Sequence, residues 1–199
     1  MGVVSNFSKK FDDKVIFDNY TVHFPSTGIC FLLGKSGVGK TTMLRSIAGL
    51  DKDYDGNIAE FGRISMMFQE YRLFPWISAI DNVLAAFGDK PLNEQILLTT
   101  SLLSELGFST DEMHLKPGQL SGGMKQRVSF ARAILAKGDT VILDEPFKEL
   151  DAGIVDIMYN IIRRESREKL FLIVTHDEIP EDVISSSCII HIGANGEIE

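Results

Sequence analysis

The sequence has little of several features that would place it in other protein classes. Its 199 residues include only two cysteines, and acidic residues outnumber basic ones to give a net charge of −8. Cys30 and Cys188 lie in apolar runs without the spacing of a metal site or a disulfide framework, so we expect buried free thiols. The acidic balance disfavours the basic face of a duplex-binding protein, and we expect no nucleic-acid partner.

Long apolar runs are missing too. No segment approaches the roughly 20 apolar residues of a membrane-spanning helix, and no signal peptide is visible. The composition, 44% hydrophobic and 24% charged, is that of a soluble globular protein. We therefore expect a cytoplasmic chain with one core, no appended regulatory domain, and any membrane part supplied by another chain.

Patterns typical of strands and of helices alternate along the chain. The predicted strands are 15–17, 20–24, 28–33, 64–68, 140–143 and 170–174, with a terminal hairpin over 188–198 around Asn195-Gly196. The predicted helices follow the glycine-rich segment 34–41 and cover 128–135 and 154–162. Between 71 and 120 the apolar residues fall at helical spacing, interrupted by prolines. This order predicts a mostly parallel sheet with helices on both sides and an inserted helical lobe.

The segment from Gly34 to Thr41 is a complete phosphate-binding loop of the form G-x-x-x-x-G-K-[ST]. In such a loop, backbone N–H groups surround a phosphate and the following helix adds its N-terminal dipole. Lys40 is expected to neutralise phosphate oxygens, and the Thr41 hydroxyl to ligate Mg²⁺. The alternative is a glycine turn that joins a strand to a helix and binds no ligand.

Two carboxylates follow the predicted strand 140–143. Asp144 and Glu145 would lie at its carboxyl end, where ligand crevices form in open α/β sheets. We expect Asp144 to organise the Mg²⁺ shell and Glu145 to act as general base toward a water molecule. The alternative is a pair of acidic residues that merely ends a strand.

A second glycine motif occurs at Leu120-Ser121-Gly122-Gly123. Ser121 is a good helix N-cap, and the two glycines leave the first backbone N–H groups of the helix uncovered, as an anion site requires. A flexible helix start after Pro117-Gly118 is the alternative interpretation.

Together these segments resemble an ATP-binding cassette (ABC) ATPase over essentially the whole chain. The resemblance implies an α/β fold whose P-loop NTPase core has a mostly parallel sheet, a small antiparallel β part and an inserted helical subdomain. It also implies one ABC ATPase domain over 1–199, with a nucleotide-binding core at 1–70 and 121–199 and a helical subdomain at 71–120.

The resemblance also implies a role for each matching residue. Catalytic roles fall on Glu145, Gln69 in the Q-loop and His176 as the switch histidine, and Mg²⁺ contacts on Thr41, Gln69 and Asp144. The implied ATP-binding residues are Phe11, Gly34, Lys35, Ser36, Gly37, Val38, Gly39, Lys40, Thr41 and Thr42. The signature residues implied to bind the ATP of a partner chain are Ser121, Gly122, Gly123 and Gln126, with Asp151 in the D-loop. For Phe11, packing at a strand edge is the alternative.

The family implies partners as well. Two cassettes, as a homodimer, would close around ATP and drive separate permease subunits at the inner face of the membrane. The segment 69–76 resembles the Q-loop of importers of nitrate, sulfonate and taurine, which implies a small anionic or nutrient solute and an extracytoplasmic binding protein. Leu73, Phe74 and Trp76 would then line the groove for the permease, although Trp76 also suits a core position.

Two departures and two alternative functions accompany this resemblance. Lys148-Glu149 replaces the small residues usual before the D-loop Leu150-Asp151, and 42–69 is shorter than in most cassettes, which predicts a trimmed antiparallel sheet. A soluble cassette of DNA repair, chromosome structure or translation is disfavoured, because no coiled coil and no second cassette are present. A non-hydrolysing regulatory subunit is disfavoured because each catalytic position is occupied.

Overall fold

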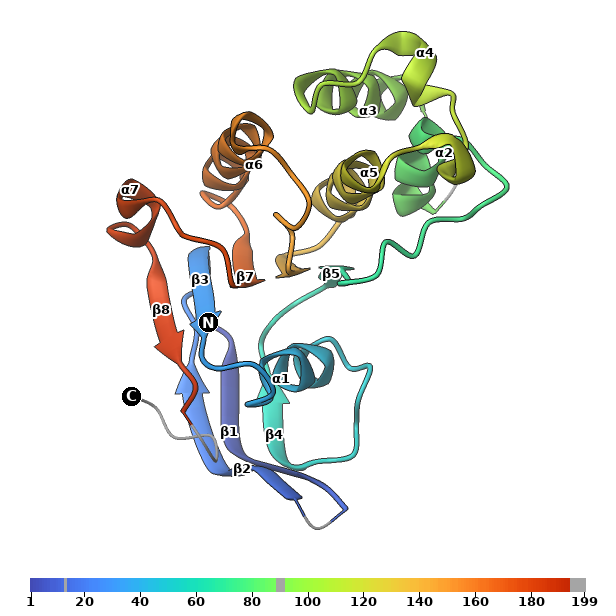
Figure 1. Cartoon of the computed structure of the whole chain (residues 1–199). Coiled ribbons are helices and arrows are strands. Elements are labelled where there is room, and N and C mark those ends of the chain that lie inside the picture. The colour runs from blue at the N-terminus through green and yellow to red at the C-terminus, as the bar shows by residue number, and fades with distance from the viewer. Residues whose placement is uncertain (13, 89–91, 194–199) are drawn as a thin grey trace.

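The computed structural model describes residues 1–12, 14–88 and 92–193 (Figure 1). Within these ranges the chain forms a five-stranded parallel sheet of order β5-β6-β7-β3-β8 and a three-stranded antiparallel sheet of order β2-β1-β4. The strands are β1 Val3–Phe11, β2 Lys14–His23, β3 Gly28–Leu33, β4 Asp55–Ala59, β5 Ile64–Met67, β6 Thr140–Asp144, β7 Leu170–Val174 and β8 Cys188–His191. The helices are α1 Lys40–Ile47, α2 Ala79–Leu84, η1 Ala85–Phe87, α3 Asn93–Glu105, α4 Thr110–Met113, η2 Pro117–Gln119, α5 Gly122–Leu135, α6 Ala152–Glu165 and α7 Glu181–Ile184.

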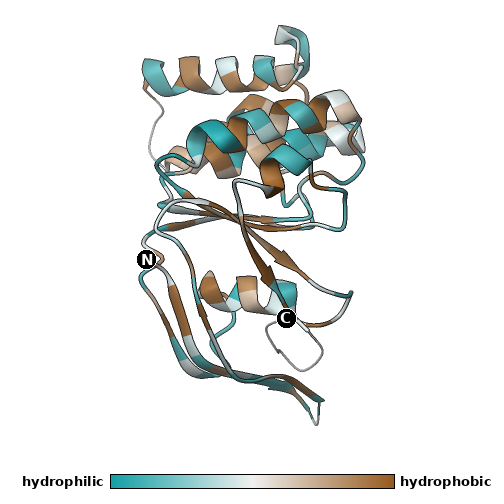
Figure 2. Ribbon diagram, turned by 90° about the vertical axis from the view of Figure 1, so that its left-hand side faces the viewer, coloured by the Kyte–Doolittle hydropathy of each residue, from teal (hydrophilic) through white to brown (hydrophobic). Residues whose placement is uncertain are grey.

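The parallel sheet is covered on both faces. Figure 1 shows α5 and α6 on one side and α1 on the other, between the two sheets. Alternate residues of β7 divide accordingly: Phe171 and Ile173 belong to a core with α5 and α6, whereas Leu172 belongs to a second core with α1 and the antiparallel sheet. A strand buried on both faces has no polar alternation, which is why these strands are almost continuously hydrophobic (Figure 2).

The structure confirms the predicted bounds of β3 and β7 and places β5 and β6 within one residue of theirs. The predicted strands 15–17 and 20–24 were wrong as separate elements, because β2 runs without interruption from Lys14 to His23. Asn19 has a positive φ of 51°, and the register with β1 shifts there, so a β-bulge breaks the polarity pattern within one strand. Of the predicted terminal hairpin, β8 is present and pairs in parallel with β3, whereas 194–199 lie outside the described residues.

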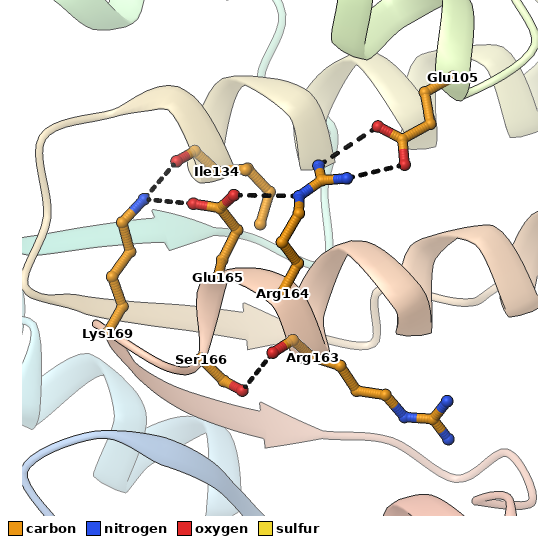
Figure 3. A network of polar contacts seen from close by, with 7 residues as sticks. All are labelled: Glu105, Ile134, Arg163, Arg164, Glu165, Ser166 and Lys169. Atoms are coloured by element: carbon orange, nitrogen blue, oxygen red, sulfur yellow. Dashed lines mark hydrogen bonds and ion pairs between the residues drawn. The ribbon is translucent and has the colours of Figure 1, made fainter.

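The helices α2, α3 and α4, which follow β5, lie beside α5, and α3 also makes polar contacts with α6. Arg164 of α6 binds both carboxylate oxygens of Glu105 at the end of α3, at 3.1 and 3.3 Å (Figure 3). Exposed ion pairs contribute about 1 kcal/mol or less, so the position of these helices depends mainly on the core shared by α3 and α5, which includes Leu102, Leu103 and Val128. No helix in the described ranges has the length and hydrophobicity to cross a bilayer.

Candidate functional site

The glycine-rich loop joins β3 to α1 at the carboxyl edge of the parallel sheet. Gly39 is the N-cap of α1 and has a φ of 108°. A Cβ atom at Gly39 would lie 2.4 Å from Cγ2 of Ile16 and 2.6 Å from Cε2 of Phe17, both on β2. Glycine therefore serves two purposes here, because it permits the turn and also lets the antiparallel sheet approach the loop closely.

Lys40 lies under this loop and is only 6% exposed. Its ammonium group donates hydrogen bonds to the carbonyl oxygens of Gly34 at 2.8 Å and Lys35 at 3.0 Å. Burial lowers the pKa of Lys40, although the nearby Glu145 and Asp144 carboxylates act in the opposite direction. The loop thus curls around a cation, as a polyphosphate site requires.

Asp144, at the end of β6, lies opposite the first turn of α1. The Thr41 hydroxyl donates a hydrogen bond to its Oδ1 at 3.2 Å. Burial raises the pKa of Asp144 above its usual value, and the bond from Thr41 opposes that rise. A hydroxyl and a carboxylate in contact suit Mg²⁺, which commonly takes one or two protein oxygens and fills its shell with phosphate oxygens and water. In the described ranges no group of three or more acidic, histidine or cysteine residues is arranged to hold a metal ion.

Glu145 and His176 form the other wall. The Glu145 carboxylate accepts a hydrogen bond from the backbone N–H of His176 at 3.2 Å and lies 3.4 Å from its ring Nε2. Burial raises the pKa of Glu145, outweighing the opposing effect of His176. A carboxylate with a raised pKa is better matched to proton abstraction near neutral pH.

The backbone of Glu145 is strained. Its φ is +54°, and a left-handed conformation costs a non-glycine residue about 1–2 kcal/mol. Its N–H donates to the carbonyl of Val174 on β7 at 2.8 Å, and its own carbonyl accepts from the Gln126 side chain at 2.8 Å. Such strain persists only where surrounding contacts fix it, and it is typical of functional sites.

These groups surround one cavity of about 580 Å³. The sequence-predicted residues that line it are Phe11, Ser36, Gly37, Gly39, Lys40, Thr41, Thr42, Gln69, Asp144, Glu145 and His176. Of the other predicted loop residues, Gly34 and Lys35 turn their carbonyls toward Lys40, and Val38 packs against the second core. Four other residues line the cavity although no motif predicted a ligand contact for them: Ile16 near the start of β2, Lys148, Val174 and Asp177.

Phe11 ends β1 at the margin of the cavity with its side chain half exposed. The ammonium group of Lys9 lies 4.8 Å from its ring centre, close enough for a cation–π interaction. Lys9 is itself buried and bonded to Asp51 and Asp53, both of which follow α1. The aromatic ring is therefore held from one side while it lines the cavity.

The second glycine motif lies apart from this cavity. Ser121 is the N-cap of α5, as predicted, and its hydroxyl accepts from the N–H of Met124 at 3.2 Å. Among the described residues, neither Ser121 nor Gly122 nor Gly123 lines the cavity that holds the P-loop. One chain therefore does not bring its two glycine motifs together.

Gln126 differs from the sequence expectation. It was expected to face the nucleotide of a partner chain, but it is 2% exposed, and its amide donates to the carbonyls of Glu145 and Pro146 at 2.8 and 2.9 Å. The structure places it inside its own chain, because the face of α5 that carries Gln126 packs toward the segment after β6.

The D-loop residues make contacts within the single chain. Asp151 is the N-cap of α6, with its Oδ1 accepting from the N–H of Ile154 at 3.1 Å. Glu149 has a positive φ of 65°, and its carboxylate accepts from the Tyr71 hydroxyl at 3.0 Å. The same carboxylate touches Gly122, where a Cβ would lie 2.4 Å from Oε2.

Comparison with known proteins agrees with this geometry. Residues 17–148 match the family model described as ABC transporter. The chain is 36% identical over 178 residues to the aliphatic sulfonates import ATP-binding protein SsuB 1 of Paracoccus denitrificans, an overlap that spans 87% of this chain and 72% of that one. It is 35% identical over 178 residues to SsuB 2 of Streptomyces avermitilis, spanning 87% and 70%.

Solved structures agree as well. A dimeric, post-hydrolysis structure of the ATP-binding cassette MJ0796 bound to ADP and Pi superposes with a TM-score of 0.84 at 26% identity, over 100% of this chain and 97% of that one. A second dimeric structure of MJ0796, a bacterial ABC transporter cassette, gives 0.85 at 25% identity with the same coverage. The chain therefore belongs to the ABC transporter family and is one of its ATPases.

Proposed function

We propose that this chain is the ATP-hydrolysing subunit of an ABC importer. The observation that carries the proposal is the Glu145 carboxylate, which is held against His176 and lines the same cavity as Lys40 and Asp144. ATP would bind there with its phosphates in the loop 34–41 and its adenine against Phe11. A regulatory module without catalysis has no need of a partly buried carboxylate of raised pKa beside the phosphate-binding loop.

The residues divide the chemistry between them. The Lys40 ammonium group would turn from the two loop carbonyls to the β- and γ-phosphate oxygens, while Glu145 accepts a proton from the attacking water. His176, with a side chain 54% exposed, would contact the γ-phosphate from the far side. Thr41, Asp144 and Gln69 would hold Mg²⁺, which supplies charge neutralisation at the phosphates when bound.

A second copy of the chain would complete the site. In the proposed homodimer, Ser121, Gly122 and Gly123 cover the nucleotide of the partner, and Asp151 lies at the contact between the chains. The separation of these residues from their own P-loop supports this, as does the dimeric state of the MJ0796 cassettes. The same proposal divides the single domain 1–199 into a core at 1–70 and 121–199 and a helical subdomain at 71–120.

Transport would require a permease that binds the surface beside Gln69. Trp76 is 67% exposed and its ring packs at a tilt against the exposed Phe74, with ring centres 5.5 Å apart, so it does not belong to the core. Leu73 lines a neighbouring hollow of about 330 Å³ together with Pro117. The names of the sulfonate-import relatives support a position in the nitrate, sulfonate and taurine group. The same proposal places the chain on the inner face of the membrane and assigns it an extracytoplasmic binding protein.

The first test is hydrolysis by the purified chain. Glu145→Gln is expected to lower Mg²⁺-dependent ATP turnover by about 100- to 10,000-fold, the usual contribution of a general base, while ATP binding survives. Glu178→Gln makes the same change at an exposed site two residues after His176 and should leave turnover unaltered. Full turnover in Glu145→Gln would refute the assignment of the base.

The second test concerns the dimer. With ATP bound, Glu145→Gln should elute as a dimer in size-exclusion chromatography, because closure no longer ends in hydrolysis. Adding Ser121→Arg, which places a long cation at the start of α5, should return it to a monomer. A monomer in both variants would contradict the two-chain site, whereas a dimer in both would exclude Ser121 from it.

A further inference from the structure

We propose that Gln126 is a positioning residue that fixes the backbone of the catalytic Glu145 and joins it to the helix of the second glycine motif. This inference rests on the proposed role of Glu145 as general base. It assigns Gln126 to its own chain's active site and not to the nucleotide of the partner.

The contact is direct and fully enclosed. Gln126 lies on α5, one turn after the glycines, and its side chain is shielded from solvent. Its amide nitrogen carries two hydrogens and bonds two successive carbonyl oxygens, those of Glu145 at 2.8 Å and Pro146 at 2.9 Å. An amide is the uncharged group that supplies two donors from one atom, so it is well suited to bridge adjacent carbonyls in a buried place.

Glu145 requires such support because of where it lies in the chain. It has a left-handed φ and directly precedes Pro146, whose ring favours an extended conformation in the residue before it. The N–H of Glu145 is held by Val174 on β7, and its carbonyl is held by Gln126 on α5. With one of these two contacts removed, the peptide is free to rotate toward the extended form and to carry the carboxylate away from His176.

The helix that carries Gln126 has Ser121 as its N-cap. Only four residues therefore separate Ser121, which is proposed to bind the partner's nucleotide, from Gln126, which holds Glu145. A short helical segment moves as a rigid unit. A displacement of the start of α5 when it binds the partner's nucleotide would therefore be transmitted to Glu145 through the two hydrogen bonds of Gln126.

The test is Gln126→Met, which keeps the length of the side chain and removes both donors. We expect turnover to fall about 100-fold, the loss typical of a misplacement of about 1 Å, with the KM for ATP unchanged. Ser129→Ala is the matched control, because Ser129 is buried on the same helix and its hydroxyl has no hydrogen-bond partner among the described residues. It should keep wild-type turnover.

A second measurement separates positioning from general structural damage. Gln126→Met combined with Glu145→Gln should turn over no more slowly than Glu145→Gln alone, because residues that act as a unit are not additive. Turnover is expressed per nucleotide-occupied site, so that partial unfolding does not enter the comparison. If Gln126→Met fails to fold, Gln126→Glu keeps the volume and replaces the donor with an acceptor, and the same loss is expected.

Several outcomes would overturn the proposal. Wild-type turnover in Gln126→Met alongside a collapse in Glu145→Gln would refute the positioning role and leave the proposed function intact. A raised KM with unchanged kcat, or loss of the ATP-bound dimer when Gln126→Met is added to Glu145→Gln, would return Gln126 to a nucleotide or partner contact. Full turnover in Glu145→Gln would instead refute the proposed function.

Discussion

Two glycines of the phosphate-binding loop should respond very differently to alanine, although two positions separate them. Both have positive φ, 79° at Gly37 and 108° at Gly39. A Cβ at Gly37 would meet no atom of the described residues within 4 Å, whereas one at Gly39 would lie 2.4 Å from Ile16 and 2.6 Å from Phe17. Both neighbours belong to the second core, and the Phe17 ring is fully enclosed there and cannot swing away.

The free energy of unfolding can be worked from these contacts. Gly37→Ala carries only the backbone strain, about 1–2 kcal/mol. Gly39→Ala adds overpacking of a buried contact, about 1–3 kcal/mol, so its total is about 2–5 kcal/mol. The entropy that alanine removes from the unfolded chain is the same at both positions and cancels in the comparison.

Thermal unfolding of the nucleotide-free chain measures the difference. For a chain of this length, about 1 kcal/mol lowers Tm by ~2–4 °C. Gly37→Ala should therefore lose about 2–8 °C and Gly39→Ala about 4–20 °C. Nucleotide is omitted because both substitutions weaken its binding and would mask the packing term. An equal loss in the two variants, or a larger one in Gly37→Ala, would refute the argument that Gly39 admits the antiparallel sheet.

Three further predictions follow from contacts at the edge of the site. Burial lowers the pKa of Lys9, but the bonds to Asp51 and Asp53 raise it by more, so the net shift is upward. Burial raises the pKa of Asp51, but its bond to Lys9 helps to make the net shift downward. Lys9→Met should therefore lower the free energy of unfolding by about 1–3 kcal/mol between roughly pH 4 and 10.5. Below and above this range, the difference in unfolding free energy between the variant and wild type, measured by urea titration, should become smaller. A difference that does not depend on pH would contradict the ion pair. Glu149→Ala removes the carboxylate that lies against Gly122, which we expect to hinder closure of the dimer. When Glu149→Ala is added to Glu145→Gln, the dimer should therefore form at a lower ATP concentration than in Glu145→Gln alone. If the ATP concentration needed for the dimer is unchanged or higher, this contact is not an obstacle to closure. Trp76→Ala should change the free energy of unfolding by about 0.5 kcal/mol or less and abolish co-purification with the permease; undiminished co-purification would exclude the docking role.

The chemistry of the site was largely predictable because its residues occur in contiguous motifs. A glycine loop between a strand and a helix, and two acids after a buried strand, leave little freedom in where their side chains lie. The carboxyl ends of parallel strands meet at one edge, so Lys40, Asp144 and His176 converge once the strands are recognised. The cavity brings them together as expected.

Other elements were not predictable from local patterns. β4 is rich in Asp, Gly and Asn, which have low strand propensity, and forms only because β1 offers an edge. β1 carries a bulge at Asn6 and a buried Lys9 where an apolar residue would be expected, so its alternation is broken. Pairing across the sheet, and not local sequence, stabilises both strands.

The sequence by itself determined the family and the order of the motifs, and it indicated the residues that we propose to contact phosphate, because these motifs are contiguous and depend on short-range backbone geometry. The tertiary structure alone decided which face of α5 is buried. That face turns Gln126 inward to the carbonyls of Glu145 and Pro146 and leaves Ser121 outward. It also decided that Glu149 touches Gly122 through space. Both contacts join segments far apart in the chain, and their geometry depends on how the helices pack across the sheet, which no local pattern records.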